Sequence, residues 1–309
     1  MKRGCVIGYD INEKGCQISY YDDSMEEPDT MMASSNNYLI PLVLGYFKDR
    51  WVFGKEAKRL AVVGEDCTET DLYGKAKRRE KVSLAGKTYD AVWLLAKYIS
   101  LTLQDFENIQ YLTFTTPETD VDMAKMLKGI GQHIGVDKEI INVQDYKESF
   151  CQYMIFQPKE LWQYESALFY CDEDRIKAYM LRRLRVDASH GMNSFVTVDE
   201  VANAQRKELE ALYPIMNKEK SPDESFKSMI ENVFEKKVIS SVYLTGEGFE
   251  KNWYPNSLRV LCNGRRAFMG NNLYSKGACY KSIRKCEPND DGPIYLDETK
   301  LTERICLRM

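Results

Sequence analysis

The chain has 309 residues, of which 43 are lysine or arginine and 47 are aspartate or glutamate, giving a formal net charge of −4. At the usual ~100–200 residues per domain, this length predicts about two domains or one large two-lobed unit. The near balance of charge argues against a nucleic-acid-binding surface. No stretch approaches the ~20 apolar residues of a membrane helix, which argues against a membrane span.

The cysteines indicate the compartment. There are nine, irregularly spaced and without a C-x-x-C pair, which is typical of reduced thiols in a cytosolic protein. Only two histidines are present, so no zinc-ligand spacing arises. The apolar run after the basic start extends only from Cys5 to Tyr9, too short for a signal peptide. We therefore expect a cytoplasmic chain without a metal site.

Strand and helix patterns alternate through the first half of the chain. Val92, Ala96 and Ile99 show the apolar spacing of a helix. The expected strands are Cys5–Tyr9, Cys16–Tyr21, Tyr38–Phe47, Arg50–Phe53, Ile109–Thr115 and Ile140–Val143. The expected helices are Lys55–Val63, Thr88–Phe106, Pro117–Ile134 and Asp145–Phe156. The polar stretch Asp66–Arg79 is predicted to be a loop.

The second half of the chain shows a similar alternation of strand and helix patterns. Thr197 and Glu200 have the spacing of a capping box, and Ser221 followed by proline marks another helix start. The expected strands are Ser166–Cys171, Arg175–Leu184 and Val238–Leu244, the expected helices are Val198–Tyr213, Ser221–Lys236 and Asn272–Lys285, and Asp187–Asn193 is an expected loop. A hairpin start followed by strand and helix alternation thus occurs twice, which predicts two related lobes.

Three segments carry a resemblance to a known fold. Ile40–Val43 leads through a strand into Phe53–Arg59, which contains Gly-Lys-Glu-Ala-Lys. Tyr111–Thr116 is followed by proline and a long helix. Val242–Phe249 ends a strand in a glycine turn, and a short strand and a Gly-Ala helix follow. In this order the segments resemble the ATPase fold shared by actin, DnaK-type chaperones and sugar kinases.

The resemblance implies an α/β architecture of two related lobes, each with a mixed five-stranded sheet flanked by helices, and a cleft between them. Residues 1–160 would form lobe I and residues 161–285 lobe II. Residues 286–309 would form a linker and the start of a C-terminal β domain, because Gly292–Thr299 resembles the apolar linker of a chaperone. A frayed tail is the alternative.

Each lobe of this fold offers a hairpin loop to the phosphates of a nucleotide. In the first loop, Asp10 matches the aspartate on the metal side, Asn12 stands in place of glycine, and Glu13 replaces a hydroxyl donor. The resemblance makes Asp10, Asn12 and Lys14 candidates for nucleotide binding, in a loop that has become vestigial. The alternative interpretation is an ordinary hairpin turn.

The second loop, Cys171–Arg175, lacks glycine and places three consecutive acids where phosphate oxygens would lie. Two unit charges ~4 Å apart repel by roughly 4 kcal/mol at an effective dielectric constant of ~20. The acids therefore argue against triphosphate hydrolysis unless a metal or Arg175 compensates. A solvated acidic turn is the alternative interpretation.

Three further segments contain candidates for nucleotide binding or catalysis. Gly246, Glu247 and Gly248 resemble the turn that holds adenosine. Asp145, preceded by Gln144, falls where relatives orient the attacking water, although aspartate also suits a helix N-terminus. The basic cluster at 75–79 lies where relatives place a catalytic lysine, or else in a solvated loop.

These patterns predict a DnaK-like pseudo-ATPase that acts as a binding or regulatory scaffold and works with a protein partner. It would bind ATP or ADP with magnesium weakly or not at all. The alternative is an active, ATP-dependent, chaperone-like ATPase, with Asp10 and Asp145 as catalytic candidates. Filament formation, as in actin-like proteins, is a third hypothesis, since a fold alone does not imply a function.

Overall fold

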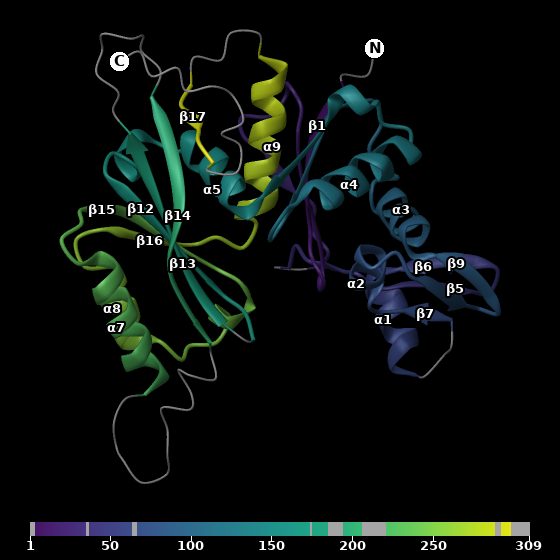
Figure 1. Ribbon diagram of the computed structural model, residues 1–309, viewed down its shortest axis with the longest axis horizontal. Helices are drawn as coiled ribbons and strands as arrows, with labels where there is room; N and C mark the ends of the chain where they lie inside the picture. The colour runs from purple at the N-terminus through teal and green to yellow at the C-terminus, as the bar shows by residue number, and fades with distance from the viewer. Residues whose placement is uncertain are drawn as a thin grey trace, which may run out of the picture. The chain divides into compact units, whose positions relative to one another are not determined.

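The computed structural model describes residues 4–34, 37–63, 67–173, 175–184, 194–205, 221–287 and 292–297. The chain divides into two compact units (Figure 1). The first unit comprises Met1–Gln152 and Tyr274–Asn289, and the second comprises Tyr153–Leu273 and Asp290–Met309. Both combine sheets with helices, so the predicted α/β class is confirmed.

The first unit is built on a sheet with the strand order β11-β10-β1-β2-β3. Its strands are β1 (Cys5–Ile11), β2 (Gly15–Tyr21), β3 (Asp29–Thr30), β10 (Ile109–Thr116) and β11 (Ile141–Asp145), with β4 (Ile40–Pro41) paired to β2. Its smaller sheets contain β5 (Leu44–Phe47), β6 (Arg50–Phe53), β7 (Thr68–Glu69), β8 (Lys81–Leu84) and β9 (Lys87–Asp90). Its helices are α1 (Gly54–Val62), α2 (Leu72–Lys77), α3 (Ala91–Thr102), α4 (Val121–His133) and η1 (Lys138–Ile140). Helices α5 (Tyr146–Ile155) and α9 (Leu273–Cys286) lie in this unit for most of their length.

Strand β1 shows how this sheet is covered. Successive side chains of a strand point to opposite faces. The Tyr9 hydroxyl lies 2.8 Å from the Thr102 hydroxyl of α3, whereas Asp10 meets Tyr146 of α5. Helices α3 and α4 thus pack on one face of the sheet, and α5 and α9 on the other.

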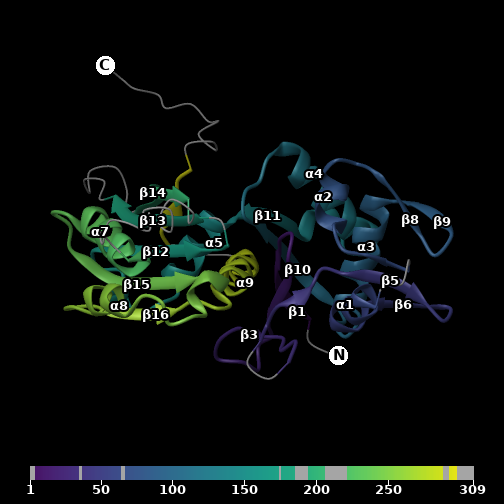
Figure 2. The same cartoon turned by 90° about the horizontal axis from the view of Figure 1, so that it is seen from below.

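Helix α9 approaches β1 unusually closely, and the two lie side by side in Figures 1 and 2. A Cβ atom on Gly8 would stand 2.1 Å from the carbonyl oxygen of Ser275, and one on Gly277 would stand 2.0 Å from that of Ser149 in α5. The Ser282 hydroxyl donates to the Ile7 carbonyl (3.1 Å) and lies 2.8 Å from the Thr113 hydroxyl. Glycines and hydroxyls therefore form this contact between helix and sheet.

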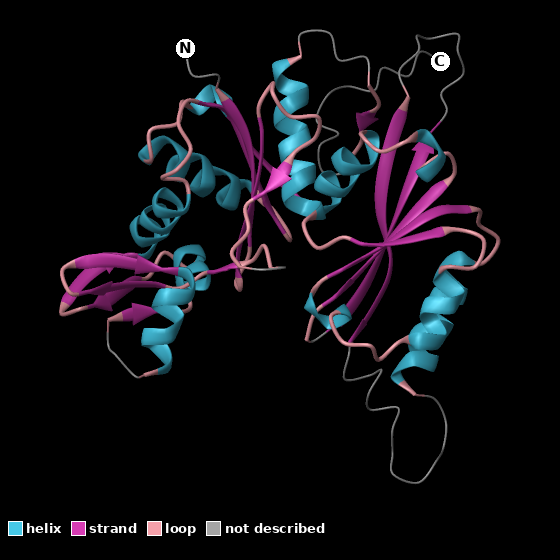
Figure 3. Ribbon diagram, turned by 180° about the vertical axis from the view of Figure 1, so that it is seen from behind, coloured by secondary structure: helices cyan, strands magenta, loops and turns pink. Residues whose placement is uncertain are grey.

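The second unit has a sheet with the order β16-β15-β12-β13-β14-β17, and its twist is visible in Figure 3. Its strands are β12 (Glu165–Cys171), β13 (Arg175–Leu184), β14 (Phe195–Gln205), β15 (Ile239–Thr245), β16 (Arg266–Met269) and β17 (Ile294–Tyr295). Its helices are η2 (Lys159–Leu161), α7 (Pro222–Phe234), η4 (Glu247–Phe249) and α8 (Pro255–Leu261). A capping box between Ser221 and Glu224 starts α7.

The two units share one sheet topology. In each, the first two strands form an antiparallel hairpin, and the third is antiparallel to the second. The fourth strand is parallel to the first, and the fifth is parallel to the fourth. When β4 and β17 are left out and the other five strands of each sheet are numbered in chain order, both sheets have the order 5-4-1-2-3.

Most of the expected elements are present, but three predictions were wrong. The predicted helix Val198–Tyr213 falls on β14 as far as Gln205 and then leaves the described residues; β14 pairs with β13 from Phe195 to Gln205, which outweighs the local capping pattern. The expected loop Asp66–Arg79 contains β7 and α2, since Leu72 and Ala76 form a short buried face. The helix expected from Thr88 begins only at Ala91, because the Asp90 carboxylate accepts hydrogen bonds from the next backbone amides.

Some expectations lie outside the described residues, namely the loop Asp187–Asn193, residue Asp174 and residues 298–309 of the expected linker and β domain. Within the expected linker, Ile294 and Tyr295 pair with β14. In the part of the chain that the structure describes, none of the helices is both long and apolar enough to cross a membrane.

Two glycine-to-alanine substitutions in the first unit should have opposite effects. Gly8→Ala places a methyl group against the backbone of α9 and should lower the free energy of unfolding by roughly 3 kcal/mol. Gly129→Ala in α4 should raise it by about 0.5–1 kcal/mol, because alanine favours a helix over glycine and the new Cβ has no neighbour within 4 Å beyond the adjoining residues and the backbone of its own helix. Urea unfolding of both variants checks this; effects of the same sign would contradict the packing of α9 on β1.

Candidate functional site

The carboxyl end of β1 carries the site residue that the sequence favoured most. Asp10 is only 4% exposed. The Tyr146 hydroxyl donates a 2.8 Å hydrogen bond to its carboxylate and accepts one from the Asn12 side-chain amide at 3.0 Å. The Tyr146 ring stacks on Tyr274 of α9, with the ring centroids 3.7 Å apart and the planes 7° from parallel. This tyrosine pair covers the Asp10 carboxylate inside the first unit.

The cover changes the acidity of Asp10. Burial raises the pKa of its carboxyl from the ordinary value of 3.8 to about 7, and the hydrogen bond from Tyr146 opposes the shift without cancelling it. Burial acts in this direction because a low-dielectric environment disfavours the charged form. Near neutral pH, the carboxyl is therefore divided between its acid and its ionised forms.

Such an environment does not suit the magnesium nucleotide that the resemblance implies. Mg²⁺ keeps several waters and binds to ionised carboxylates, whereas Asp10 is buried and hydrogen-bonded to a tyrosine. The Asn12 side-chain oxygen accepts hydrogen bonds from the backbone amides of Lys14 (2.9 Å) and Gly15 (3.2 Å), which closes the hairpin. The interactions of Asn12 and the backbone of Lys14 thus belong to an ordinary hairpin turn.

Asp145 lies at the end of β11, opposite Thr116 of β10. Its carboxylate accepts a 2.8 Å hydrogen bond from the Glu148 amide, so it caps the N-terminus of α5. The neighbouring Gln144 is buried and donates to the Ser149 hydroxyl at 2.7 Å. Asp145 and Gln144, which were considered for orienting an attacking water, therefore both form structural hydrogen bonds.

Lys75 and Lys77 of the basic cluster lie in α2, and Arg78 and Arg79 follow the end of this helix. Lys75 forms a 2.8 Å ion pair with Glu69, and Arg78 pairs with Asp71 (2.9 Å) and Glu80 (2.6 Å). Lys77 lies over the ring of Tyr73. These contacts divide the cluster among separate partners.

In the second unit, the acidic hairpin loop and the glycine turn lie against each other. The Asp172 carboxylate accepts a 2.8 Å hydrogen bond from the Arg175 amide, which closes the turn. Gly246 has a positive φ of 94°, and a Cβ there would stand 2.2 Å from the carbonyl oxygen of Cys171; a Cβ on Gly248 would stand 2.2 Å from the Cys171 sulfur. Packing on the hairpin thus accounts for both glycines, and Glu247 between them starts the short helix η4.

The structure brings Asp10 and Asn12 together with Tyr146, a residue that the sequence analysis missed. Tyr146 follows Asp145 directly, so its position beside the candidate site was open to prediction. Its partner Tyr274 gave no signal, because their stacking joins residues far apart in the chain. Asp10, Asn12 and Tyr146 therefore form a closed, hydrogen-bonded cluster.

Residues 27–298 match a protein family described as "Family of unknown function (DUF5716) C-terminal". The chain belongs to this family. The match to the DUF5716 C-terminal family begins after the β1–β2 hairpin, so it includes Tyr146 and Gly248 but not Asp10. None of the curated proteins matches the chain. The family description names no activity, so function has to be inferred from the residues of the site.

Replacing Asp10 by asparagine should remove a pH dependence of stability. The pKa of Asp10 is higher in the folded than in the unfolded chain, so the stability that its protonated carboxyl contributes is complete at low pH and is lost as the pH rises toward 7. The shift corresponds to about 4 kcal/mol in total. The free energy of unfolding of Asp10→Asn, minus that of the wild type, should therefore rise by about 2–3 kcal/mol from pH 5 to pH 8. Urea unfolding at both pH values measures this difference.

Tyr146→Phe is the matched control, because it keeps the carboxyl and removes only its hydrogen-bond donor. Loss of this donor raises the Asp10 pKa further, so the dependence on pH should become steeper. If the wild type and Asp10→Asn gave parallel curves between pH 5 and pH 8, the covered carboxyl described above would be wrong.

Gly248→Ala should destabilise the second unit by about 1–3 kcal/mol through its contact with Cys171. Cys171→Ala removes the sulfur atom that the new methyl group would meet. The double variant should therefore lose at least about 0.5 kcal/mol less than the sum of the two single variants. Urea unfolding of all four chains checks this, and strict additivity would show that Gly248 is not held by Cys171.

Proposed function

We propose that the chain is a DnaK-like pseudo-ATPase, an actin-type fold of two related lobes that serves as a binding or regulatory scaffold. The observation that carries the proposal is the cover of Tyr146 over Asp10, the residue that would organise magnesium. The common strand order of the two sheets supports the fold, because the resemblance implies two related lobes with mixed sheets.

Three further observations in the separate units support the loss of hydrolysis. The pKa of Asp10 near 7 makes it a poor magnesium ligand at neutral pH. Asp172 and Glu173 put negative charge in the second loop. Gly246 and Gly248 already have Cys171 as a close neighbour where the resemblance expects adenosine.

The alternative is an active, ATP-dependent, chaperone-like ATPase. One observation favours it, because a buried carboxyl with a pKa near 7 is the kind of group that general acid–base catalysis uses. In that case Asp10 would bind through a rearranged loop, with Tyr146 displaced.

The scaffold proposal includes a protein partner and a cytoplasmic location. The described cysteines are all free thiols, which fits a reducing compartment. A fold that no longer uses nucleotide as its ligand would act through the surfaces that it presents to other proteins.

Thermal unfolding with millimolar ATP or ADP and Mg²⁺ tests the proposal. A nucleotide at ~100 times its Kd would stabilise the chain by about 2.7 kcal/mol, which corresponds to a rise of several degrees in Tm. We expect no rise with either nucleotide and no phosphate release in a hydrolysis assay.

A rise in Tm that Asp10→Asn abolishes would overturn the proposal, and phosphate release with the same dependence would establish the alternative. Gly129→Ala, a substitution in α4 away from the Asp10 cluster, is the control and should leave any nucleotide response unchanged.

A further inference from the structure

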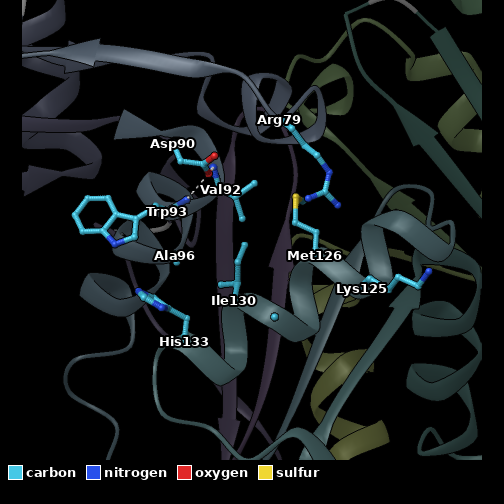
Figure 4. A pocket seen from close by; sticks show the side chains of 10 residues that line it. Arg79, Asp90, Val92, Trp93, Ala96, Lys125, Met126, Ile130 and His133 are labelled. Carbon is cyan, nitrogen blue, oxygen red and sulfur yellow. Dashed lines mark hydrogen bonds between the residues drawn. The ribbon is translucent and has the colours of Figure 1, made fainter. Parts of the chain in front are cut away.

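A groove crosses the outer side of α3 and α4 in the first unit (Figure 4). It has a volume of about 370 Å³. Its floor is apolar and consists of the buried Ala96, Met126 and Ile130 with the half-buried Val92. A smaller hollow of about 110 Å³ shares Arg79 and Met126 with it.

The rim is open and polar. Trp93 and His133 lie at one end of the groove and Arg79 and Lys125 at the other (Figure 4). All of these rim residues are exposed, Trp93 by 38%. Small-molecule sites usually bury 70–90% of their ligand, whereas this groove would cover a ligand from one side only. An open groove between two helices suits a segment of another protein.

Trp93 is held as a fixed anchor at one end. Its ring stacks on Tyr89, with centroids 5.5 Å apart and planes 11° from parallel, and it also contacts Trp51 at 5.8 Å. A tryptophan that is partly exposed and already immobilised loses little entropy on binding. Tryptophan and arginine are also the residues that most often dominate binding at protein interfaces.

The charges of the groove indicate the sign of the partner. Within the described residues, Arg79 and Lys125 form no ion pair. Of the nearby carboxylates, Asp90 caps the N-terminus of α3 and Asp120 caps that of α4, where backbone amides and the positive end of the helix dipole offset part of their negative charge. Asp122, beside the smaller hollow, is the remaining carboxylate. Arginine presents a planar fork of donors that suits a carboxylate.

Two residues, Gly129 and Arg79, keep this groove open and positively charged. Gly129 lies inside α4, where alanine would make a better helix, and its missing side chain leaves open space above the floor. Arg79 follows α2 with a positive φ of 53°, a position where glycine is the usual residue. At both positions the residue present is the less favourable one for the local backbone. Glycine occupies a helical position, and arginine occupies a left-handed position.

We propose that the α3–α4 groove binds a short, acidic, amphipathic segment of a partner protein. Apolar side chains of the segment lie on Ala96, Met126 and Ile130, an apolar or aromatic group packs on Trp93, and a carboxylate pairs with Arg79. This inference rests on the proposed scaffold role and names its surface and the chemistry of its partner.

A displayed library of helical peptides, with apolar residues fixed at i, i+3, i+4 and i+7 and the polar positions randomised, tests this on the full chain. The enriched peptides should carry a surplus of aspartate and glutamate. Fluorescence anisotropy should show that Gly129→Phe, which fills the groove, weakens their binding at least about tenfold, as expected for a central contact. Arg79→Glu should select basic peptides instead.

Gln132→Phe is the matched control, since it adds the same ring to an exposed position of α4 that does not line the groove. It should leave the affinity unchanged. If Gly129→Phe fails to fold, Trp93→Ala replaces it, and its loss of binding should be of similar size. Circular dichroism and Tm establish that each variant is folded.

Enriched peptides without an acidic surplus, or binding that persists in folded Gly129→Phe, would overturn the inference. It would also be overturned if the naphthalene sulfonate dye ANS bound the groove while no acidic peptide did. Since the nucleotide test does not involve this groove, the absence of peptide binding together with the absence of a nucleotide response would reject the groove and leave the pseudo-ATPase proposal standing.

Discussion

The close approach of α9 to β1 determines how the first unit is built. At Gly8 the backbones of strand and helix leave no room for a methyl group, and at Gly277 the helix meets α5 in the same way. Hydroxyl groups of Ser275 and Ser282 then satisfy polar groups across this contact. A surface of small side chains allows the helix one depth and one register, so this contact is specific although it contains few large apolar groups.

The same contact explains the chemistry at Asp10. Gly8 and Asp10 point to the same face of β1, so the helix that seats on Gly8 also brings Tyr274 against Tyr146. The tyrosine hydroxyl then closes over the carboxylate, and the raised pKa follows from packing without any ligand. The other face of the sheet is packed against α3 and α4, whose outer surface stays open. Within one unit, the residue expected to bind a nucleotide is closed off, and a surface that no motif indicated is accessible.

The elements that could be predicted from the sequence are those whose deciding interaction is local. The β1–β2 hairpin and the cap at Ser221 arise from neighbouring residues and were predicted. The same cap spacing at Thr197 was misleading, because pairing with β13 determines the structure there. Gly246 could be recognised as important, but its packing on Cys171 could not, because that contact joins distant strands. The Tyr146–Tyr274 stack left no trace in the sequence for the same reason.

The position of α9 late in the sequence has a consequence for the order in which the chain folds. The sheet of the first unit begins at Cys5, yet the helix that covers one of its faces ends at Cys286. At the ribosome's ~5–20 residues per second, the stretch between α5 and α9 takes on the order of ten seconds to synthesise. During this interval the face of the sheet that Gly8 presents has α5 but still lacks α9, while the second unit is being made. The nascent chain is therefore most prone to aggregation and most dependent on cellular chaperones just before α9 leaves the ribosome.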